Sequence, residues 1–253
     1  MPAILTLLTD FGSADSYVAE LKGVILSAVP GATLVDISHS IAPGDVRAAA
    51  YVLDRAWRQF PAGTVHLAVV DPGVGTERAA LALAAHGQFF VGPDNGLFSF
   101  VLRDAPVQCV ALPVPQAAAP TFHGRDLFAP AAAALAAGRS LASLGAPFTG
   151  IPERLSTREP FHEGKVLVGE VIHVDRFGTL ITNFTPDNMP DYASLEVEGI
   201  EIGRLQRTFG DVTTGALLAY VGSDGHVEIA VRDGSAARKL GIGVGGRVRA
   251  RLG

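Results

Sequence analysis

The sequence is poor in the residues on which several classes of protein depend. It has a single cysteine, Cys109, which excludes a disulfide framework and a cysteine-based zinc site. Charged residues make up only 18% of the chain and the net charge is −5, so there is no basic stripe to neutralise phosphates, and nucleic acid is not an expected partner. The histidines show no metal-ligand spacing such as H-E-x-x-H, and we expect no metal.

Long apolar runs are also missing. The opening "MPAILTLLTD" has no Lys or Arg and its apolar stretch is short, which is not typical of a signal peptide. The alanine-rich stretch at residues 129–138 falls far below the ~20 residues that a bilayer requires and predicts a close-packed helix. We therefore expect no membrane span and predict a cytoplasmic protein.

Residues 1–155 alternate between strand-like and helix-like patterns. "AILTLL", "TLVDI" and "TVHLAVV" are apolar runs typical of buried strands, and amphipathic stretches separate them. Strands at residues 79–85 and 88–92 are expected to pair across the turn between them, which makes the sheet mixed rather than purely parallel. The sequence predicts an α/β domain in which helices flank a mixed sheet.

Residues 156–253 have a different pattern. Short β-branched runs such as "TLITNF", "HVEIAVR" and "GRVRARL" are separated by Gly, Asp and Asn, which predicts a smaller all-β barrel domain. "GIGVGG" at residues 241–246 lacks the βαβ surroundings of a dinucleotide-binding loop, so we interpret it as a turn. No organic cofactor is expected.

The tripeptide Asp10-Phe11-Gly12 is the magnesium-binding motif of protein kinases, but the Gly-rich loop, lysine and H-R-D segment that precede it in kinases are absent. Asp10 instead follows the first predicted strand, and ligand crevices form at such strand ends in open α/β sheets. Its carboxylate could accept hydrogen bonds from the vicinal hydroxyls of a ribose. The alternative is a cap for the following helix.

Two further polar groups follow predicted strands or precede predicted helices. In "VVDPGVGTERAA" an irregular loop places Asp71 and Arg78 near one another, where a plain loop salt bridge is the alternative to a functional pair. In "TFHGRDLF" His123 directly precedes a helix. A neutral imidazole is well suited to accept a proton near neutral pH, so His123 is a candidate base.

Taken in order, these pieces resemble one family, the S-adenosyl-L-methionine (SAM) hydroxide adenosyltransferases, or SAM hydrolases, which are related to the fluorinase and chlorinase. The resemblance covers nearly the whole chain and rests on "LTDFGSADSYVAELKGVI", "VDISHSIAPGDVRAAAYVL", "FPAGTVHLAVVDPGVGT", "VGPDNGLFSFVL", "PTFHGRDLFAPAAAALAAG", "HVDRFGTLITNF" and "GSDGHVEIAVRDGSAA". It implies a homotrimer with active sites between subunits, and hydrolysis of SAM to adenosine and L-methionine at the ribose C5′ without a metal.

The resemblance also implies roles for single residues. Asp71, Arg78 and His123 would handle the water, and Asp10 the ribose. The other substrate-binding positions that it implies are Asp15, Ser16, Phe122, Asp175, Phe177, Thr179, Phe209, Ser223 and Val231. The family commonly has Asn where this chain has Thr179, and its halogenase members have Tyr in place of Asp71. Two alternatives to hydrolysis are halide-dependent 5′-halogenation and binding of SAM or adenosine without catalysis.

Overall fold

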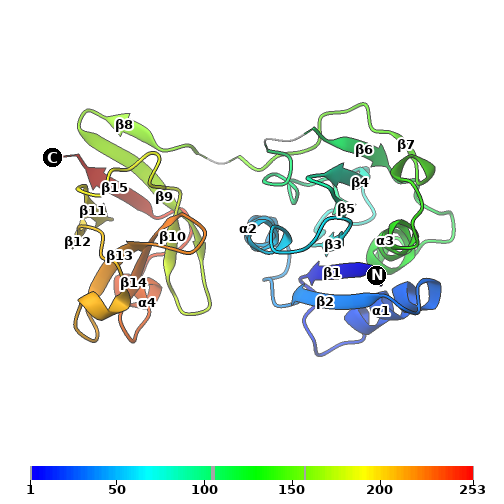
Figure 1. Cartoon of the computed structure of the whole chain (residues 1–253), viewed down its shortest axis with the longest axis horizontal. Coiled ribbons are helices and arrows are strands. Elements are labelled where there is room, and N and C mark those ends of the chain that lie inside the picture. Colours follow the sequence, from blue (N-terminus) through cyan, green and yellow to red (C-terminus); the bar gives the residue numbers. More distant parts are fainter. Residues whose placement is uncertain (1, 104–105, 157, 253) are drawn as a thin grey trace. The chain divides into compact units, whose positions relative to one another are not determined.

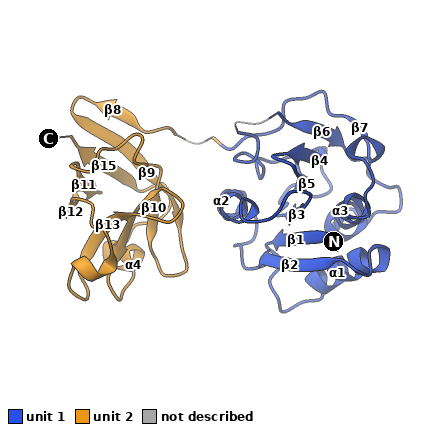
Figure 2. Cartoon of the chain, in the orientation of Figure 1, with its two compact units in different colours: residues 1–155 blue, residues 156–253 orange. Residues whose placement is uncertain are grey.

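The chain forms two compact units, residues 1–155 (unit 1) and residues 156–253 (unit 2), which are coloured separately in Figure 2. The structure, a computed structural model, describes residues 2–103, 106–156 and 158–252. Each unit has its own hydrophobic core. Within the described ranges no helix combines the length and the apolar character needed to cross a membrane.

Unit 1 is built on a seven-stranded sheet with the order β2-β1-β3-β5-β4-β6-β7 (Figure 1). Its strands are β1 (Ile4–Thr9), β2 (Thr33–Ser38), β3 (Val65–Val69), β4 (Ala80–Ala85), β5 (Gln88–Pro93), β6 (Gln108–Ala111) and β7 (Ala146–Pro147). β1 pairs in parallel with both β2 and β3, whereas β4 pairs antiparallel with β5 and β6. The predicted pairing of the strands on either side of residues 86 and 87 is therefore confirmed.

The helices of unit 1 contribute to two separate hydrophobic clusters. They are α1 (Tyr17–Ala28), α2 (Val46–Trp57), a π-helical turn η1 (Gly124–Phe128) that continues into α3 (Ala129–Ala136), and a short 3₁₀ turn η2 (Leu141–Ser143). Apolar residues of α1 and α3 pack in one cluster, and those of α2 pack in the other. Each cluster takes side chains from the central strands, because successive residues of a strand point to opposite faces.

The starts of the two long helices differ. The carboxylate of Asp45 accepts a hydrogen bond from the backbone N–H of Ala48 at 2.9 Å, which satisfies one of the free donors in the first turn of α2. Helix α1 begins after Ser16, whose side chain makes no capping hydrogen bond. Asp10 lies well before that helix and does not cap it, so the alternative reading of this carboxylate is wrong.

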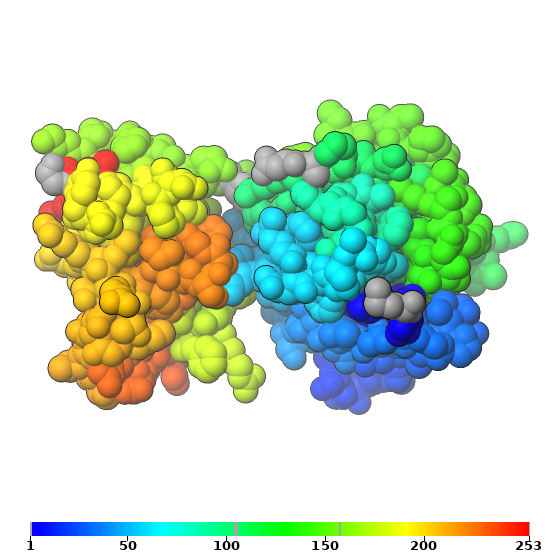
Figure 3. All heavy atoms as spheres, in the orientation of Figure 1, coloured from blue at the N-terminus to red at the C-terminus, as the bar shows by residue number. Residues whose placement is uncertain are grey.

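Unit 2 contains an eight-stranded sheet that is nearly closed. Its strands are β8 (Phe161–Glu163), β9 (Val166–Val174), β10 (Leu180–Thr182), β11 (Ser194–Val197), β12 (Ile200–Gly203), β13 (Leu217–Val221), β14 (Val227–Val231) and β15 (Arg247–Arg251). The order along the sheet is β12-β11-β15-β9-β10-β14-β13, and a bridge from Leu205 to Ala219 brings the segment after β12 to β13. In Figure 3 the yellow and orange side chains from β11 to β14 form much of the visible face of this unit.

Unit 2 is not purely β. Besides a 3₁₀ turn η3 (Phe209–Asp211), it contains a short helix α4 (Ala236–Leu240). Ser235 caps its start by accepting a hydrogen bond from the N–H of Arg238 at 3.2 Å, and Gly241 ends it in the left-handed conformation at φ +68°. Five residues are too few to show a helical period, so the apolar pattern did not indicate this helix.

A buried histidine lies in the centre of the unit 1 sheet. His66 on β3 is fully buried, its Nδ1 lies 2.7 Å from Oγ1 of Thr6, and its Nε2 contacts Oε1 of Gln88. Its ring stacks on Phe90 with 4.9 Å between the ring centroids. Burial lowers the pKa of His66 to about 4, although the hydrogen bond that its Nε2 donates to Oε1 of Gln88 acts in the opposite direction.

This pKa predicts a loss of stability in mild acid. Between pH 6.5 and about 4 the unfolded chain binds a proton at His66 that the folded chain does not, so the free energy of unfolding falls as pH decreases through this range. The free energy of unfolding is expected to fall by roughly 3 kcal/mol across this range. We expect the stability difference between the wild type and His66→Gln, measured by urea unfolding at pH 7 and pH 4, to shrink by about this amount at pH 4. Equal pH dependence of the two proteins would contradict the assignment.

Candidate active site

The ends of two neighbouring strands in unit 1 open into one cavity. β1 and β3 run in parallel with Thr9 opposite Val69, so the residues that follow them leave the sheet at the same edge. A cavity of about 690 Å³ lies there, and its lining includes Asp10, Phe11, Asp71, Phe122, His123 and Arg125. This is the strand-end crevice that the sequence predicted for Asp10.

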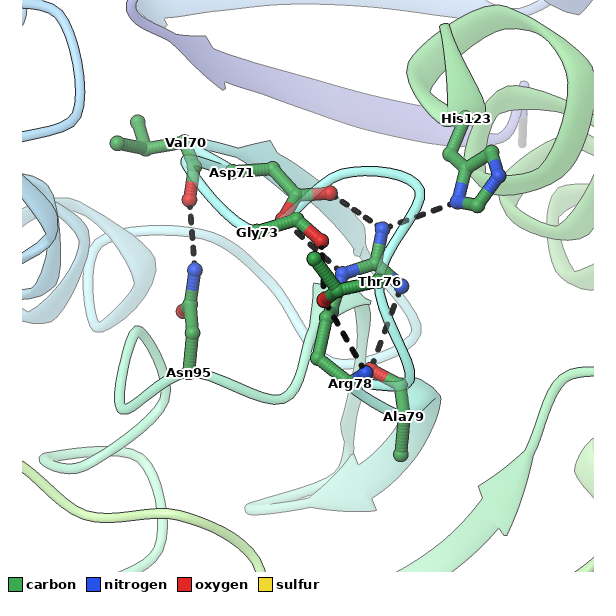
Figure 4. A network of polar contacts seen from close by, with 8 residues as sticks. All are labelled: Val70, Asp71, Gly73, Thr76, Arg78, Ala79, Asn95 and His123. Carbon is green, nitrogen blue, oxygen red and sulfur yellow. Dashed lines mark hydrogen bonds and ion pairs between the residues drawn. The ribbon is translucent and has the colours of Figure 1, made fainter. Parts of the chain in front are cut away.

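Asp71, Arg78 and His123 contact one another (Figure 4), and Asp71 and His123 line this cavity whereas Arg78 is not among its lining residues. The guanidinium of Arg78 donates from Nε to Oδ1 of Asp71 at 3.0 Å and from Nη2 to Oδ2 of the same carboxylate. Nη2 also donates to Nδ1 of His123 at 3.1 Å. The Asp71 and Arg78 side chains are only 5% and 10% exposed, so this ion pair is buried and not a plain surface salt bridge. The guanidinium carbon of Arg78 lies over the Phe128 ring, 5.2 Å from its centroid.

The loop from Asp71 to Arg78 is held by its own backbone and by contacts from other loops. The hydroxyl of Thr76 donates to the carbonyl of Gly73 at 2.7 Å. Gly75 has φ +78°, and a Cβ there would lie 2.7 Å from the carbonyl oxygen of Pro120. Only glycine therefore allows this loop to approach the segment that leads into His123, so the close packing of two distant loops brings the three side chains together.

The surroundings of His123 favour its neutral form. Burial has the largest effect and lowers the pKa of His123, and the positive charge of Arg78 lowers it further. The carboxylates of Asp71 and Asp126 act in the opposite direction without reversing the shift. Because Nδ1 accepts a hydrogen bond from Arg78, the proton of the neutral ring belongs on Nε2. The geometry thus makes Nε2–H a donor, and the Nδ1 lone pair is already engaged.

Asp10 lies on the turn after β1. Its Oδ2 accepts a hydrogen bond from the N–H of Gly44 at 2.8 Å, and Gly44 lines the same cavity. This contact links the turn after β1 to the loop between β2 and α2. Since one backbone donor does not use all the lone pairs of a carboxylate, Asp10 can also accept hydrogen bonds from a ligand.

From the aromatic and ionic border of this cavity, the sequence predicted only Phe122 as a site residue. The rings of Phe11, Tyr17 and Phe122 contact one another edge to face, with centroids 5.4 to 6.0 Å apart. Arg125 lies over the Phe122 ring at 5.0 Å and donates to Glu20 at 2.9 Å, which links η1 to α1. The aromatic residues on both sides of "GSADS" and directly before His123 were the available signal for this border.

Unit 2 has a second cavity, also of about 690 Å³, that gathers most of the residues predicted there. Among its lining residues are Asp175, Phe177, Thr179, Phe209, Tyr220 and Val231. The side chain of Asp175 accepts hydrogen bonds from the N–H groups of Phe177 at 2.9 Å and Thr179 at 2.8 Å, so it shapes the turn between β9 and β10. Phe177 is 78% exposed, which leaves its ring available for a ligand or a partner surface.

Tyr220 is a lining residue of this second cavity that the sequence did not single out. Its hydroxyl donates to Glu228 at 2.6 Å, and its ring contacts that of Phe209 with 5.0 Å between the centroids. Burial and the neighbouring Glu228 carboxylate raise the pKa of Tyr220 well above its usual range. A tyrosine in a short strand fits the β pattern without any functional reason, so nothing in the sequence marked it.

The structure does not bring every predicted residue to a cavity wall. Asp15 and Ser16 are exposed and do not line the unit 1 cavity, and the hydroxyl of Ser16 donates to Glu20 at 2.7 Å. Ser223 lies in the turn between β13 and β14, outside the lining of the unit 2 cavity. Their roles in binding remain predictions. Among the described residues, no group of three or more His, Cys, Asp or Glu side chains could hold a metal ion.

Comparison with known proteins gives the same interpretation from a separate direction. Residues 5–145 match the model of the SAM hydroxide adenosyltransferase N-terminal domain, and residues 169–249 match that of the C-terminal domain. The chain belongs to the SAM hydroxide adenosyltransferase family. The predicted resemblance and the predicted two-domain layout are therefore confirmed.

Individual members of this family and its relatives align over nearly the full length. A Thermus thermophilus protein named (R)-S-adenosyl-L-methionine hydrolase is 45% identical, over 96% of this chain and 97% of its own. A fluorinase from Nocardia brasiliensis is 29% identical over 99% of this chain and 97% of its own. The crystal structure of an uncharacterized conserved protein from Thermotoga maritima has a TM-score of 0.90 at 37% identity and covers 98% of this chain and 99% of its own.

Replacing Arg78 by Met is expected to raise the pKa of His123. The substitution removes the positive charge beside the ring and leaves the negative charge of Asp71 in place, so the imidazolium form becomes more favourable. The measurement is NMR titration of the histidine ring protons, with the His123 signal identified by its loss in His123→Gln. Arg58→Met removes an exposed guanidinium that pairs with Asp54 on α2 and is the matched control. An unchanged His123 pKa in Arg78→Met would show that the two side chains are not in contact in solution.

Proposed function

We propose that this chain hydrolyses SAM to adenosine and L-methionine by attack of water at the ribose C5′. The observation that carries the proposal is the buried cluster of Asp71, Arg78 and His123 at a cavity that also contains Asp10. Relatives at 37 to 45% identity that are named (R)-S-adenosyl-L-methionine hydrolase support it. Because their name specifies the (R) configuration, we also propose that this chain prefers the (R) epimer at sulfur.

The reaction requires the enzyme to position and deprotonate a water molecule. In SAM the C5′–S bond breaks as the C5′–O bond forms, and the electron pair of the broken bond returns to sulfur, which leaves as the neutral thioether of methionine. No general acid or metal is needed to stabilise such a leaving group, so we propose a metal-independent and cofactor-independent reaction. The enzyme must hold the water in line and remove one proton. Positioning in a near-attack geometry can contribute about 7 to 11 kcal/mol.

We propose that Asp71 accepts the proton of the attacking water and that His123 orients this water. Nδ1 of His123 accepts a hydrogen bond from Arg78, so the ring offers Nε2–H to the water oxygen, while the Asp71 carboxylate can accept the water proton. A carboxylate is basic enough, because the water oxygen becomes strongly acidic as it bonds to carbon. This division of roles differs from the expectation that the imidazole itself accepts the proton, and its physical reason is the engaged Nδ1.

A carboxylate beside the attacking position favours water over halide. The negative charge of Asp71 repels a halide ion at close range but attracts a water proton. The substrate-binding roles follow the resemblance: Asp10 holds the ribose hydroxyls, Asp15 and Ser16 lie near the methionine end, and Phe122 is a further substrate-binding residue. In unit 2 the proposed contacts are Asp175 and Ser223 for methionine, and Phe177, Thr179, Phe209 and the backbone at Val231 for adenine.

We further propose that the active protein is a cytoplasmic homotrimer in which unit 1 of one copy and unit 2 of a neighbour enclose each SAM molecule. Most of the residues predicted to bind one ligand line two separate cavities in different units, and a ligand that contacts both sets needs one unit of each kind. The exposed ring of Phe177 would be covered by such an arrangement. We also propose that the domain boundary lies after Leu155 and that helices flank both faces of the unit 1 sheet.

Incubation with SAM in ¹⁸O-labelled water tests the reaction itself. We expect mass spectrometry to find the label at the 5′-oxygen of adenosine, because the water oxygen bonds to C5′. Unlabelled adenosine would refute attack at that carbon. Added chloride should produce no 5′-chloro product, whereas a halogenated nucleoside would replace the proposal by halogenation. Tight SAM binding without release of methionine would leave a non-catalytic binding protein.

His123→Ala is expected to lower kcat by about 10²-fold, the cost typical of a misplaced reacting group, because the ring no longer orients the water. SAM binding, measured by calorimetry, should persist because the ring contacts the water and not the substrate's binding groups. His162→Ala removes an exposed histidine on β8 and should keep full activity. Undiminished turnover in His123→Ala would rule out a role for this side chain in the reaction.

A further inference from the structure

The turn that follows β1 is held by hydrogen bonds to buried groups. Thr9 is fully buried, and its Oγ1 accepts a hydrogen bond from the N–H of Phe11 at 3.3 Å. Between these two residues lies Asp10, and both Asp10 and Phe11 line the unit 1 cavity. Gly12 closes the turn at φ +69°. The direction in which the Asp10 carboxylate points therefore depends on how this turn is held.

His39, which directly follows β2, contacts both ends of the turn. Its Nδ1 lies 2.8 Å from Oγ1 of Thr9, and its backbone carbonyl accepts a hydrogen bond from the N–H of Gly12 at 2.8 Å. On the other side of the ring, Nε2 lies 3.2 Å from Oδ1 of Asp36. The second oxygen of that carboxylate accepts a hydrogen bond from Nζ of Lys22 at 2.6 Å.

The contacts of His39 favour one arrangement of protons. The Asp36 carboxylate lies at ion-pair distance from Nε2 of His39 but outside hydrogen-bond geometry, and its negative charge favours a proton on that nitrogen. With the proton on Nε2, Nδ1 is an acceptor, and the Thr9 hydroxyl donates to it. The same hydroxyl oxygen accepts from the N–H of Phe11. The hydrogen bonds from His39 through Thr9 to Phe11 are therefore linked, and linked hydrogen bonds of this kind reinforce one another.

We propose that His39 is a positioning residue for Asp10: with Thr9 it holds the turn of residues 9–12 so that the Asp10 carboxylate meets the ribose hydroxyls of the substrate. His39 is not among the residues that line the cavity, so it acts through the turn and not by touching the substrate. The inference rests on the proposed function, in which Asp10 binds the ribose.

The chain contains a matched control on the same strand. The hydroxyl of Thr6 lies 2.7 Å from Nδ1 of His66, and Thr6 is as fully buried as Thr9. Thr6→Val and Thr9→Val therefore each remove one buried hydroxyl of β1 that contacts the Nδ1 atom of a histidine. Only the second of these contacts belongs to the turn that carries Asp10.

The test measures binding of adenosine and of 2′,3′-dideoxyadenosine by calorimetry. If Asp10 binds the hydroxyls, the wild type should prefer adenosine by about tenfold or more, since a hydrogen bond to a charged group is lost in the dideoxy ligand. We expect Thr9→Val to reduce this preference at least about threefold by weakening adenosine binding alone. Thr9→Ser, which keeps the hydroxyl, should retain the preference, and Thr6→Val should behave as the wild type. Should Thr9→Val fail to fold, His39→Gln breaks the same contact from the other side.

The possible results separate the two claims. A wild-type preference that Thr9→Val and His39→Gln leave intact would overturn the positioning role of His39 but not the role of Asp10. An equal loss in Thr6→Val would also overturn it, because the effect would then be general destabilisation. If the wild type does not prefer adenosine over the dideoxy ligand, ribose binding by Asp10 is refuted, and the positioning role of His39 with it. The proposed reaction is tested separately by the release of adenosine from SAM.

Discussion

The guanidinium of Arg78 joins two groups that come from distant parts of the chain. It pairs with both oxygens of Asp71 and donates a further hydrogen bond to His123. An unpaired carboxylate at the low exposure of Asp71 would cost several kcal/mol, so the loop is stable only in the conformation that brings Arg78 to it. The tautomer of the His123 ring follows from this contact, and its neutral form follows from burial first and from the charge of Arg78 second.

The fold delivers these groups by ending parallel strands at one edge. β2, β1 and β3 are adjacent and parallel, and the residues just beyond them are His39, Asp10 and Asp71. The strands themselves are largely apolar because their side chains pack in the two hydrophobic clusters of unit 1, and the polar groups of the site lie on the residues that follow the strands. Contacts between neighbouring loops, such as Gly44 to Asp10, then fix polar groups that the strands only bring near one another.

The parts that the sequence predicted are those with a local cause. Apolar runs gave the strands of both units, and Asp71 and Arg78 lie within one short loop, so their pairing was foreseeable. The contact with His123 depends on the approach of Gly75 to Pro120, which no local pattern records. Tyr220 fits a strand equally well with or without a function, so its place in the unit 2 cavity could be found only from the fold.

The two carboxylates of the unit 1 cavity differ in charge balance, and this difference bears on turnover. Arg78 compensates the charge of Asp71, whereas Asp10 is held by a backbone N–H of Gly44. Asp10 therefore adds negative potential to the cavity, which attracts the sulfonium cation of the proposed substrate. Once the C5′–S bond breaks, the sulfur is neutral and this attraction ends. The same charge thus favours entry of the substrate without retaining the thioether product.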